Sequence, residues 1–193
     1  METLENQIDK ILSTPKFPFP EPRNYQVEAY KNWVKNNYQG VFAMATGTGK
    51  TITSLNCLLN IYKETQTYRG LIIVPTIALV NQWKKECKKF NFSNIICVSS
   101  KTKWKDNLSF FSTASRFTNT SFIVIVTYAS FARPKFQHYL KQLSSETLLI
   151  ADEMHNIGSP RVLATLENVQ LNKRIGLSAT PFRQYDEIGN KGI

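Results

Sequence analysis

Two short segments of the sequence carry residues whose types and spacing suit chemistry on a nucleoside triphosphate. The first, residues 44–51, reads Met-Ala-Thr-Gly-Thr-Gly-Lys-Thr. Its glycines allow the backbone to curl with several N–H groups pointing inward, and a helix that starts after such a turn attracts anions. Lys50 would place a positive charge beside the β- and γ-phosphates, and the Thr51 hydroxyl would lie where magnesium binds.

We expect the nucleotide to contact most of this glycine-rich turn. The strict pattern G-x-x-x-x-G-K-[ST] has glycine where this chain has Met44, but the core Gly-x-Gly-Lys-Thr is intact. The alternative is a chance glycine-rich turn, which the apolar segment before it and the helical segment after it disfavour. The residues expected to bind nucleotide here are Thr46, Gly47, Thr48, Gly49, Lys50 and Thr51.

Two adjacent carboxylates form the second segment. The apolar run 147–151 leads directly into Asp152 and Glu153, and His155 follows two residues later. Partly buried carboxylates are costly to leave unpaired, and the carboxyl end of a central parallel strand faces the ligand crevice. There Asp152 would hold magnesium together with Thr51, and Glu153 would orient and deprotonate the water that attacks the γ-phosphate. A surface turn with solvated acids is the alternative, and the presence of the glycine-rich turn in the same chain weakens it.

Short apolar segments alternate with helical ones along most of the chain. Strands are predicted at residues 41–45, 71–74, 95–98, 122–127, 147–151 and 174–178, and helices at 24–37, 50–65, 77–90 and 129–145. This alternation predicts an α/β fold with a mainly parallel central sheet covered by helices on both faces. Asn24 is expected to cap the helix over 24–37 and Gly40 to end it, whereas residues 99–121 are expected to form a loop or a fragmentary helix.

The N-terminal region has a different character. Periodic apolar residues predict a short amphipathic helix over 3–13, and a cluster of prolines predicts an extended connector after it. We therefore expect residues 1–22 to be a helix and connector and residues 23–193 to be one α/β domain.

Basic charge is concentrated in the middle of the chain. The formal net charge is +10, and residues 41–149 hold 14 basic and four acidic side chains, whereas the flanking regions are balanced. Such a local excess favours a polyanionic partner such as nucleic acid, and a solvated basic face is the alternative. Within 101–105, lysines surround Trp104, for which a solvated loop is favoured over a base-stacking platform.

Composition excludes several classes of protein. The three cysteines lack metal-ligand spacing and only two histidines accompany them, so a zinc site is not expected and a reducing cytoplasm is the expected location. No apolar run is long enough to span a bilayer, and the acidic N-terminus does not resemble a secretory signal. No membrane partner is expected.

Taken together, these segments resemble the first RecA-like domain of a superfamily-two helicase or translocase of the DExH type. The similarity is greatest to the branch that contains the motors of type I and type III restriction enzymes, and it extends over residues 22–193. Residues 44–51 match motif I, in which the family tolerates variation at the first position. Residues 152–155 match motif II in its D-E-x-H form.

Further motifs occur in the order that the family has. Residues 23–26 resemble the element in which glutamine reads adenine, which implies nucleotide contacts for Arg23 and Gln26; a plain polar helix position is the alternative for Gln26. Residues 74–83 resemble motif Ia and residues 126–128 a later strand-contacting element. The residues thereby implied to contact nucleic acid are Pro75, Thr76, Thr127 and Tyr128.

The last motif couples nucleotide state to strand movement in the family. Residues 178–181 read Ser-Ala-Thr-Pro and resemble motif III. The resemblance implies coupling roles for Ser178 and Thr180, and His155 of motif II is placed to take part. A simple turn before Pro181 is the alternative for Ser178 and Thr180, and helix capping is the alternative or additional role of Thr76.

The resemblance implies an ATP- and magnesium-dependent motor that moves on nucleic acid, with DNA favoured over RNA. It also implies a second RecA-like domain, in this or another chain, that supplies an arginine finger, and it admits a nuclease or methyltransferase partner. Nothing after Pro181 resembles that second domain, so we expect these 193 residues alone to bind nucleotide weakly and hydrolyse it poorly. Two alternatives remain: a P-loop nucleotide switch or NTPase that does not act on nucleic acid, and a non-catalytic interaction module.

Overall fold

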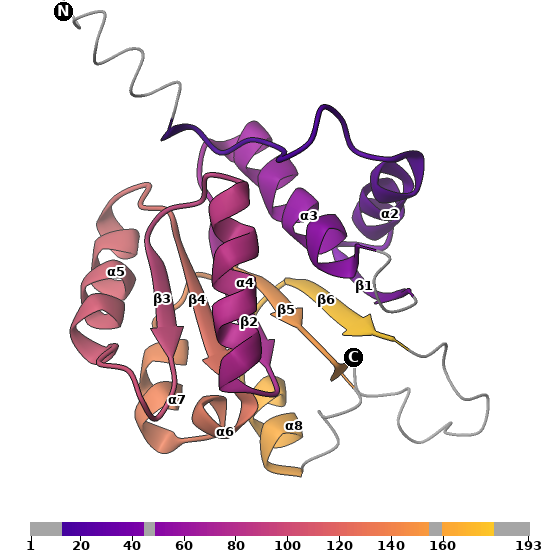
Figure 1. The fold of residues 1–193 in the computed structure, drawn as a ribbon. Coiled ribbons are helices and arrows are strands. Elements are labelled where there is room, and N and C mark those ends of the chain that lie inside the picture. The colour runs from indigo at the N-terminus through magenta and orange to yellow at the C-terminus, as the bar shows by residue number, and fades with distance from the viewer. Residues whose placement is uncertain (1–12, 45–48, 155–159, 180–193) are drawn as a thin grey trace, which may run out of the picture.

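The computed structural model describes residues 13–44, 49–154 and 160–179. Six strands within these ranges form one sheet in which every neighbouring pair is parallel, in the order β1-β6-β5-β2-β4-β3 (Figure 1). The strands are β1 (Gln39–Ala43), β2 (Arg69–Val74), β3 (Ile95–Val98), β4 (Phe122–Thr127), β5 (Leu148–Ala151) and β6 (Lys173–Ser178).

Two layers of helices cover the sheet. On one face lie α2 (Asn24–Lys35), α3 (Lys50–Thr65) and α4 (Ile77–Lys89), whose apolar residues join one buried cluster with alternate strand residues such as Ile72 and Ile125. The second cluster contains the other strand residues, such as Leu71 and Val124, and packs against the helices of the opposite face. Those helices are α5 (Lys105–Phe117), α6 (Tyr128–Phe131), α7 (Pro134–Leu140) and α8 (Pro160–Glu167).

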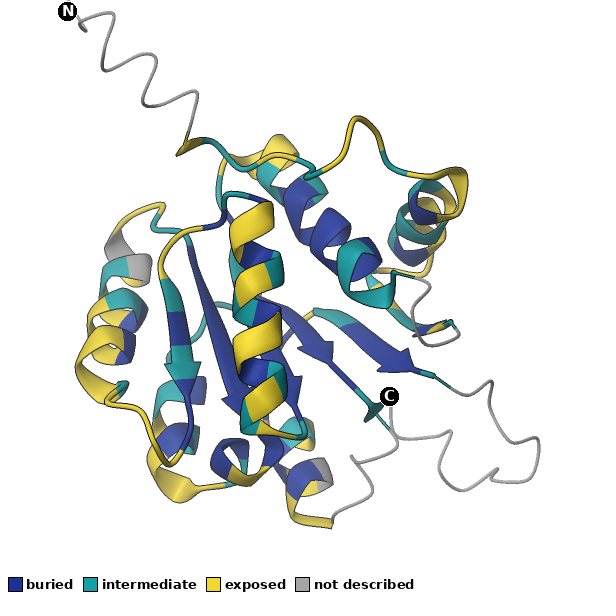
Figure 2. Ribbon diagram, in the orientation of Figure 1, coloured by how far each residue is buried: buried dark blue, intermediate teal, exposed yellow. Residues whose placement is uncertain are grey.

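Burial on both faces explains the composition of the central strands. All six residues of β4 are buried, as are the last five of β2 (Figure 2). A strand covered on both sides has no polar face, so its sequence reads as a continuous apolar run instead of an alternating one. The predicted α/β fold with a parallel, doubly covered sheet is confirmed.

The order of the strands determines which face each helix covers. From β1 to β2 and on to β3 the chain moves across the sheet in one direction, and α3 and α4 lie on the first face. From β3 through β4 and β5 to β6 it moves back, and α5 to α8 lie on the second face. Crossovers between parallel strands keep one handedness, so a reversal of direction requires a change of face.

Most predicted elements are present. The helix over 50–65 and the strands over 95–98 and 122–127 have the predicted bounds, and the other four strands agree within two residues at each end. The predicted helix over 129–145 is instead two short helices, because Pro134 begins α7 after a break at Arg133. The predicted helix over 3–13 lies almost wholly outside the described residues.

Four details differ from the expectations. The region 99–121 contains α5, a helix of 13 residues, in which the core-facing positions include Ser112 as well as Leu108. Helix α8 was not predicted. Arg23, not Asn24, is the N-cap of α2, and the helix ends before two residues with positive φ, Asn37 and Tyr38, so that Gly40 lies inside β1.

The segment before α2 is fastened to the domain. The backbone N–H of Lys16 donates to the carbonyl of Phe90 at 2.9 Å, and the Phe17 ring packs edge-on against the Phe90 ring at 5.6 Å. Within the described ranges, no helix is both long and apolar enough to cross a bilayer.

The three thiols should differ sharply in reactivity. Burial raises the pKa of all three thiols, but Cys57 and Cys87 are fully buried, whereas Cys97 is only partly buried and lies near Lys84 and Lys88, which oppose the rise. Because the thiolate is the reactive form, we expect one thiol of the native chain to react with a disulfide reagent and all three to react in denaturant. The single reactive thiol should disappear in Cys97→Ser; rapid reaction of two thiols in the native chain would contradict this packing.

Candidate functional site

The carboxyl ends of three neighbouring strands bring the two chemical segments to one edge of the sheet. Strand β6 lies between β1 and β5, and the arrowheads of the strands point to the same end of the sheet (Figure 1). Just beyond β1, the N–H of Met44 donates to the carbonyl of Ser178 at 3.2 Å, and beyond β5 the N–H of Asp152 donates to the carbonyl of Ile73 at 2.8 Å. Met44 and Asp152 therefore leave the same end of the sheet, with β6 between them.

Lys50 is the central residue of this edge. It is the first residue of α3, its side chain is 11% exposed, and its Nζ lies 3.8 Å from Oε1 of Glu153. The Nζ atom is buried and has no hydrogen-bond partner among the described residues. A buried ammonium without hydrogen bonds is costly, so the position is suited to an anion that supplies acceptors.

Gly49 shapes the turn that precedes α3. Its φ of +87° is one that residues with a Cβ rarely adopt, and a Cβ there would lie 3.1 Å from Oη of Tyr25. Nε2 of Gln26 would lie 3.7 Å from the same Cβ. The start of α2 thus packs directly against the start of α3, which places Tyr25 and Gln26 beside Gly49.

Gln26 is held rigidly in that position. Its side chain is 4% exposed, and its Oε1 accepts a hydrogen bond from the N–H of Arg23 at 2.9 Å. The capping contact explains why a glutamine is placed at the third position of α2. Contact of Arg23 and Gln26 with a nucleotide stays a prediction.

Asp152 is buried, with 8% of its surface exposed, and is held by defined donors. Its Oδ2 accepts from Nε1 of Trp83 at 2.8 Å, and its Oδ1 accepts from the N–H of Glu153 at 2.9 Å. Burial raises the pKa of this carboxyl, while the Trp83 hydrogen bond opposes that rise. A carboxylate has about four lone-pair positions, so two remain after these contacts.

Glu153 has a strained backbone. Its φ is +51°, in the left-handed region that residues other than glycine and asparagine seldom occupy, and its side chain is 26% exposed. Strain of this kind persists only where surrounding contacts impose it, and it is frequent at functional sites. In this backbone conformation the carboxylate of Glu153 faces Lys50.

The oxygen donors here fit a magnesium ion bound with a nucleotide. Magnesium is held by one or two carboxylates together with phosphate oxygens and water, and does not need a complete protein cage. Asp152 has acceptor capacity left, and Thr51 is the second residue of α3, next to Lys50. Among the described residues there is no group of three or more His, Cys, Asp or Glu side chains suited to a metal.

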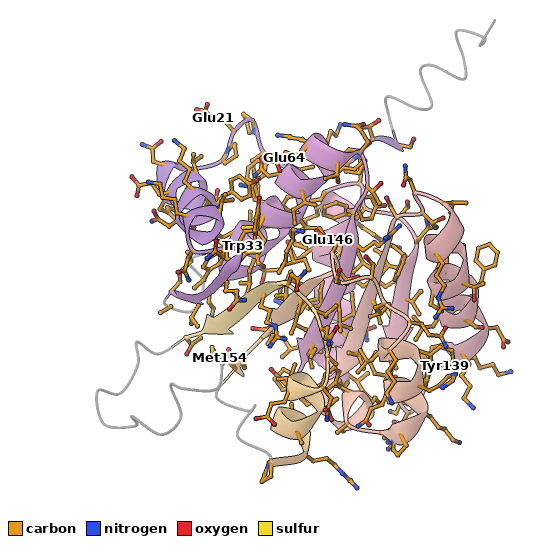
Figure 3. The ribbon with its side chains drawn as sticks, turned by 180° about the vertical axis from the view of Figure 1, so that it is seen from behind. Glu21, Trp33, Glu64, Tyr139, Glu146 and Met154 are labelled. Carbon is orange, nitrogen blue, oxygen red and sulfur yellow. The ribbon has the colours of Figure 1, made fainter. Side chains whose placement is uncertain are left out.

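One contact at this edge was not predicted from the sequence. A Cβ on Gly176 of β6 would lie 2.5 Å from Sδ of Met154, the residue after Glu153. Met154 lies where β6 ends (Figure 3) and packs against the second buried cluster. Its side chain therefore fills the space above Gly176 and ties the acidic pair to the neighbouring strand.

Two of the four residues expected to contact nucleic acid are N-caps. Thr76 begins α4 and its hydroxyl accepts from the N–H of Leu79 at 3.3 Å; Thr127 does the same for Ser130 at the start of α6, also at 3.3 Å. Pro75 is partly exposed and Thr76 is exposed, whereas Thr127 is buried. The capping role of Thr76 is therefore confirmed, and strand contact by these residues stays a prediction.

Tyr128 lies deeper than a surface contact would. It is 8% exposed, and its hydroxyl donates to the backbone carbonyl of Asp152 at 2.9 Å. Burial raises the pKa of this phenol, so the hydroxyl stays protonated and remains a donor. Trp83 and Tyr128 both hold Asp152, and neither of these contacts was predicted from the sequence.

Of the remaining residues considered in the sequence, some are described by the structure and others are not. Ser178 is buried at the end of β6, where its carbonyl accepts from the N–H of Met44. Trp104 packs edge-on against Phe136 and Tyr139, which agrees with the preference against a base-stacking platform. The residues whose placement lies outside the described ranges are Thr46, Gly47, Thr48, His155 and Thr180.

Comparison with known proteins identifies relatives along nearly the whole chain. The family model described as "Type III restriction enzyme, res subunit" matches residues 19–183. A DNA 3'-5' translocase XPB2 from Sulfurisphaera tokodaii is 31% identical over 192 residues, which cover 95% of this chain and 36% of that protein. The chain thus spans about a third of the length of this relative.

Solved structures share the fold. The SWI2/SNF2 ATPase core of Sulfolobus solfataricus in complex with dsDNA has a TM-score of 0.66 at 20% identity, covering 90% of this chain and 35% of that one. A nuclease-deletion mutant of the type ISP restriction-modification enzyme LlaGI, in complex with a DNA substrate mimic, has a TM-score of 0.66 at 23% identity, covering 88% of this chain and 19% of that one.

The contact between Gly176 and Met154 can be tested by a double-mutant cycle. Gly176→Ala should lower the free energy of unfolding by about 1–3 kcal/mol, because the new methyl group overlaps the Met154 sulfur. In a Met154→Ala background the same change should cost less than about 1 kcal/mol, as measured by urea denaturation.

Gly40→Ala is the matched control, because a Cβ there would make only an ordinary contact of 3.6 Å with Trp33. An equal cost of Gly176→Ala in both backgrounds would show that the two residues do not compete for the same space.

Proposed function

The chain belongs to the family of the type III restriction enzyme res subunit, and on that premise we propose that it is the ATP-binding half of an ATP-dependent DNA translocase or helicase. The observation that carries the proposal is the buried ammonium of Lys50. It lacks hydrogen bonds among the described residues and lies 3.8 Å from the Glu153 carboxylate. A γ-phosphate bound between these groups would supply the missing acceptors and would lie beside a candidate general base.

Each residue of the site has a distinct role in this proposal. Lys50 and the backbone of the glycine-rich turn bind the phosphates, and Gly49 permits the turn. Glu153 orients the attacking water and accepts its proton. Thr51 and Asp152 would hold magnesium, which when bound neutralises charge that develops on the phosphate oxygens. His155, Ser178 and Thr180 are proposed to transmit the nucleotide state, and Arg23 and Gln26 to contact the base.

DNA is the proposed polymer. The basic excess lies in residues 41–149, and four of its lysines lie within α4. The relative from S. tokodaii is described as a DNA translocase, and the two solved structures compared contain DNA or a DNA mimic. Pro75 and Thr76 are proposed to contact the bound strand directly, whereas Thr127 and Tyr128 are buried and are proposed only to lie beneath it.

The proposal includes a second RecA-like domain, in this or another chain. In motors of this kind that domain closes on ATP and contributes an arginine finger, which is worth about 10³–10⁵ in rate. These 193 residues alone should therefore bind nucleotide and hydrolyse it poorly. The proposal also includes a nuclease or methyltransferase as a further partner of the motor.

Removal of the Lys50 ammonium should weaken nucleotide binding without lowering the stability of the fold. Lys50→Ala should weaken binding of a fluorescent ATP analogue roughly 10- to 100-fold, because a hydrogen bond to a charged group is worth about 1.5–3 kcal/mol. The free energy of unfolding without nucleotide should stay equal or rise, since the change removes a buried ammonium to which the described residues offer an ion pair at 3.8 Å but no hydrogen bond. Lys141→Ala, at an exposed position after α7, is the control for nucleotide binding; unchanged affinity in Lys50→Ala would refute the site.

Replacement of Glu153 should affect hydrolysis and not binding. Glu153→Gln keeps the size of the side chain and removes the base, so ATP turnover should fall about 10²–10⁴-fold when the chain is assayed with its second domain. Affinity for the ATP analogue should remain within a few-fold of the original. Normal turnover by Glu153→Gln would mean that another group accepts the proton.

Salt dependence distinguishes a DNA motor from a nucleotide switch. We assume that the chain contacts about four phosphates of a single strand. A plot of the logarithm of its affinity for a labelled oligonucleotide against the logarithm of salt concentration should then have a slope of about −3. The measurement is a fluorescence-anisotropy titration at several salt concentrations. Negligible binding at low salt would favour a switch that does not act on nucleic acid.

A further inference from the structure

Asp152 accepts hydrogen bonds from both helical layers of the fold. The donor to its side chain, Trp83, belongs to α4 and to the first buried cluster; it is 1% exposed and its Nε1 lies 2.8 Å from Oδ2. The donor to its backbone carbonyl, Tyr128, belongs to α6 and to the second buried cluster, with its hydroxyl 2.9 Å from that oxygen. The two helices lie on opposite faces of the sheet, and β5 delivers Asp152 between them.

These two contacts fix different degrees of freedom. The Tyr128 hydroxyl holds the peptide that follows Asp152, where the backbone turns into the strained conformation of Glu153. The Trp83 indole fixes the rotation of the Asp152 carboxylate, since one oxygen is held by the indole and the other by the N–H of Glu153. With the carboxylate held in one orientation, the unused lone pairs of its two oxygens also have a fixed orientation.

We propose that Trp83 and Tyr128 are positioning residues that hold Asp152 in the orientation required to bind a divalent cation together with the nucleotide. The inference rests on the proposed function, in which Asp152 is a metal ligand. Groups that hydrogen-bond to a metal ligand commonly contribute 10- to 100-fold to metal affinity, because they reduce the freedom that the ligand loses on binding. The Trp83 indole touches neither phosphate nor metal in this arrangement, so it acts through Asp152 alone.

The chain provides matched controls for both residues. Trp33 is 2% exposed and its Nε1 donates to the carbonyl of Arg174 at 2.9 Å, so Trp33→Phe deletes an equally buried indole hydrogen bond outside the site. Tyr68 is 3% exposed and its hydroxyl accepts from the N–H of Ser93 at 2.9 Å, so Tyr68→Phe deletes an equally buried hydroxyl contact. Trp33 lies on α2, which is separated from α4 by α3 (Figure 1).

The test is a magnesium titration of the 193-residue chain with a fluorescent, non-hydrolysable ATP analogue. Trp83→Phe should raise the magnesium concentration at half-maximal binding about 10-fold or more, and Tyr128→Phe several-fold. Affinity for the analogue in excess EDTA should not change, because Lys50 and the turn are untouched. Trp33→Phe and Tyr68→Phe should leave the magnesium requirement unchanged even where they lower the melting temperature.

The outcomes separate this inference from the proposed function. If the unmodified chain shows no magnesium-dependent binding of the analogue, the proposed function fails. If it does, and Trp83→Phe and Trp33→Phe shift the magnesium requirement equally, the positioning role is refuted and the proposed function stands.

A second measurement covers the case in which Trp83→Phe does not fold. The chain has three tryptophans, so its ¹⁵N-labelled indole groups give three signals, which Trp33→Phe and Trp104→Phe would assign. Addition of magnesium with the analogue should shift the Trp83 signal, because its acceptor Asp152 gains a cation, and should leave the Trp33 signal in place. An unmoved Trp83 signal under saturating conditions would overturn the inference.

Discussion

The approach of the Lys50 ammonium to the Glu153 carboxylate depends on one topological fact: β6 lies between β1 and β5. Because a single strand separates the glycine-rich turn from the acidic pair, residues about a hundred positions apart end at the same edge, and their charged atoms lie 3.8 Å apart. Among the described residues this arrangement is unfavourable without a ligand, since it combines a buried ammonium to which they offer no hydrogen bond, a buried carboxylate and a residue with positive φ. The two buried clusters on either side of the sheet hold the edge in that state, and an anion with a cation would relieve it.

Periodicity was enough to predict the fold class because the central strands are buried on both faces. Continuous apolar runs such as β2 and β4 are readable without any knowledge of tertiary structure. The helices of the second layer were harder to predict, because buried polar residues interrupt their apolar pattern. In α5 a small polar residue, Ser112, occupies a fully buried position, which breaks the apolar spacing. In α8 the buried Thr165 has the same effect, and its hydroxyl is satisfied by Gln137 from α7. Each of these hydroxyls donates to a carbonyl of its own helix and also contacts a glutamine of the α7 region, and this second contact cannot be read from the local sequence.

The site shows the same division between local and tertiary information. Lys50, Thr51, Asp152 and Glu153 could be named from residue type and spacing, because a phosphate-binding turn and an acidic strand end are local patterns. Trp83 and Gly176 could not, since their importance comes from what they touch: the Asp152 carboxylate 69 residues away and the Met154 sulfur. Trp83 sits on an amphipathic helix, where a buried aromatic residue reads as ordinary core. Only the acceptor of its N–H distinguishes it, and a buried indole N–H always requires one.

The positions of the lysines on α4 limit how this helix could contact the proposed DNA. The helix begins at the carboxyl edge with Thr76 as N-cap, and Lys88 and Lys89 lie in its last turn. At 1.5 Å per residue, Lys88 lies about 18 Å from Thr76 along the helix axis. In the last turn these charges are favourable beside the helix dipole, and Lys89 is also paired with Glu86 at 2.7 Å. Near the edge, the exposed residues of α4 are instead Ala78, Asn81 and Gln82. Direct contacts there would be made by hydroxyl, amide and backbone groups, with the distant lysines contributing long-range attraction. A strand bound in this way would be held mainly through its backbone, as suits a motor that must step along any sequence.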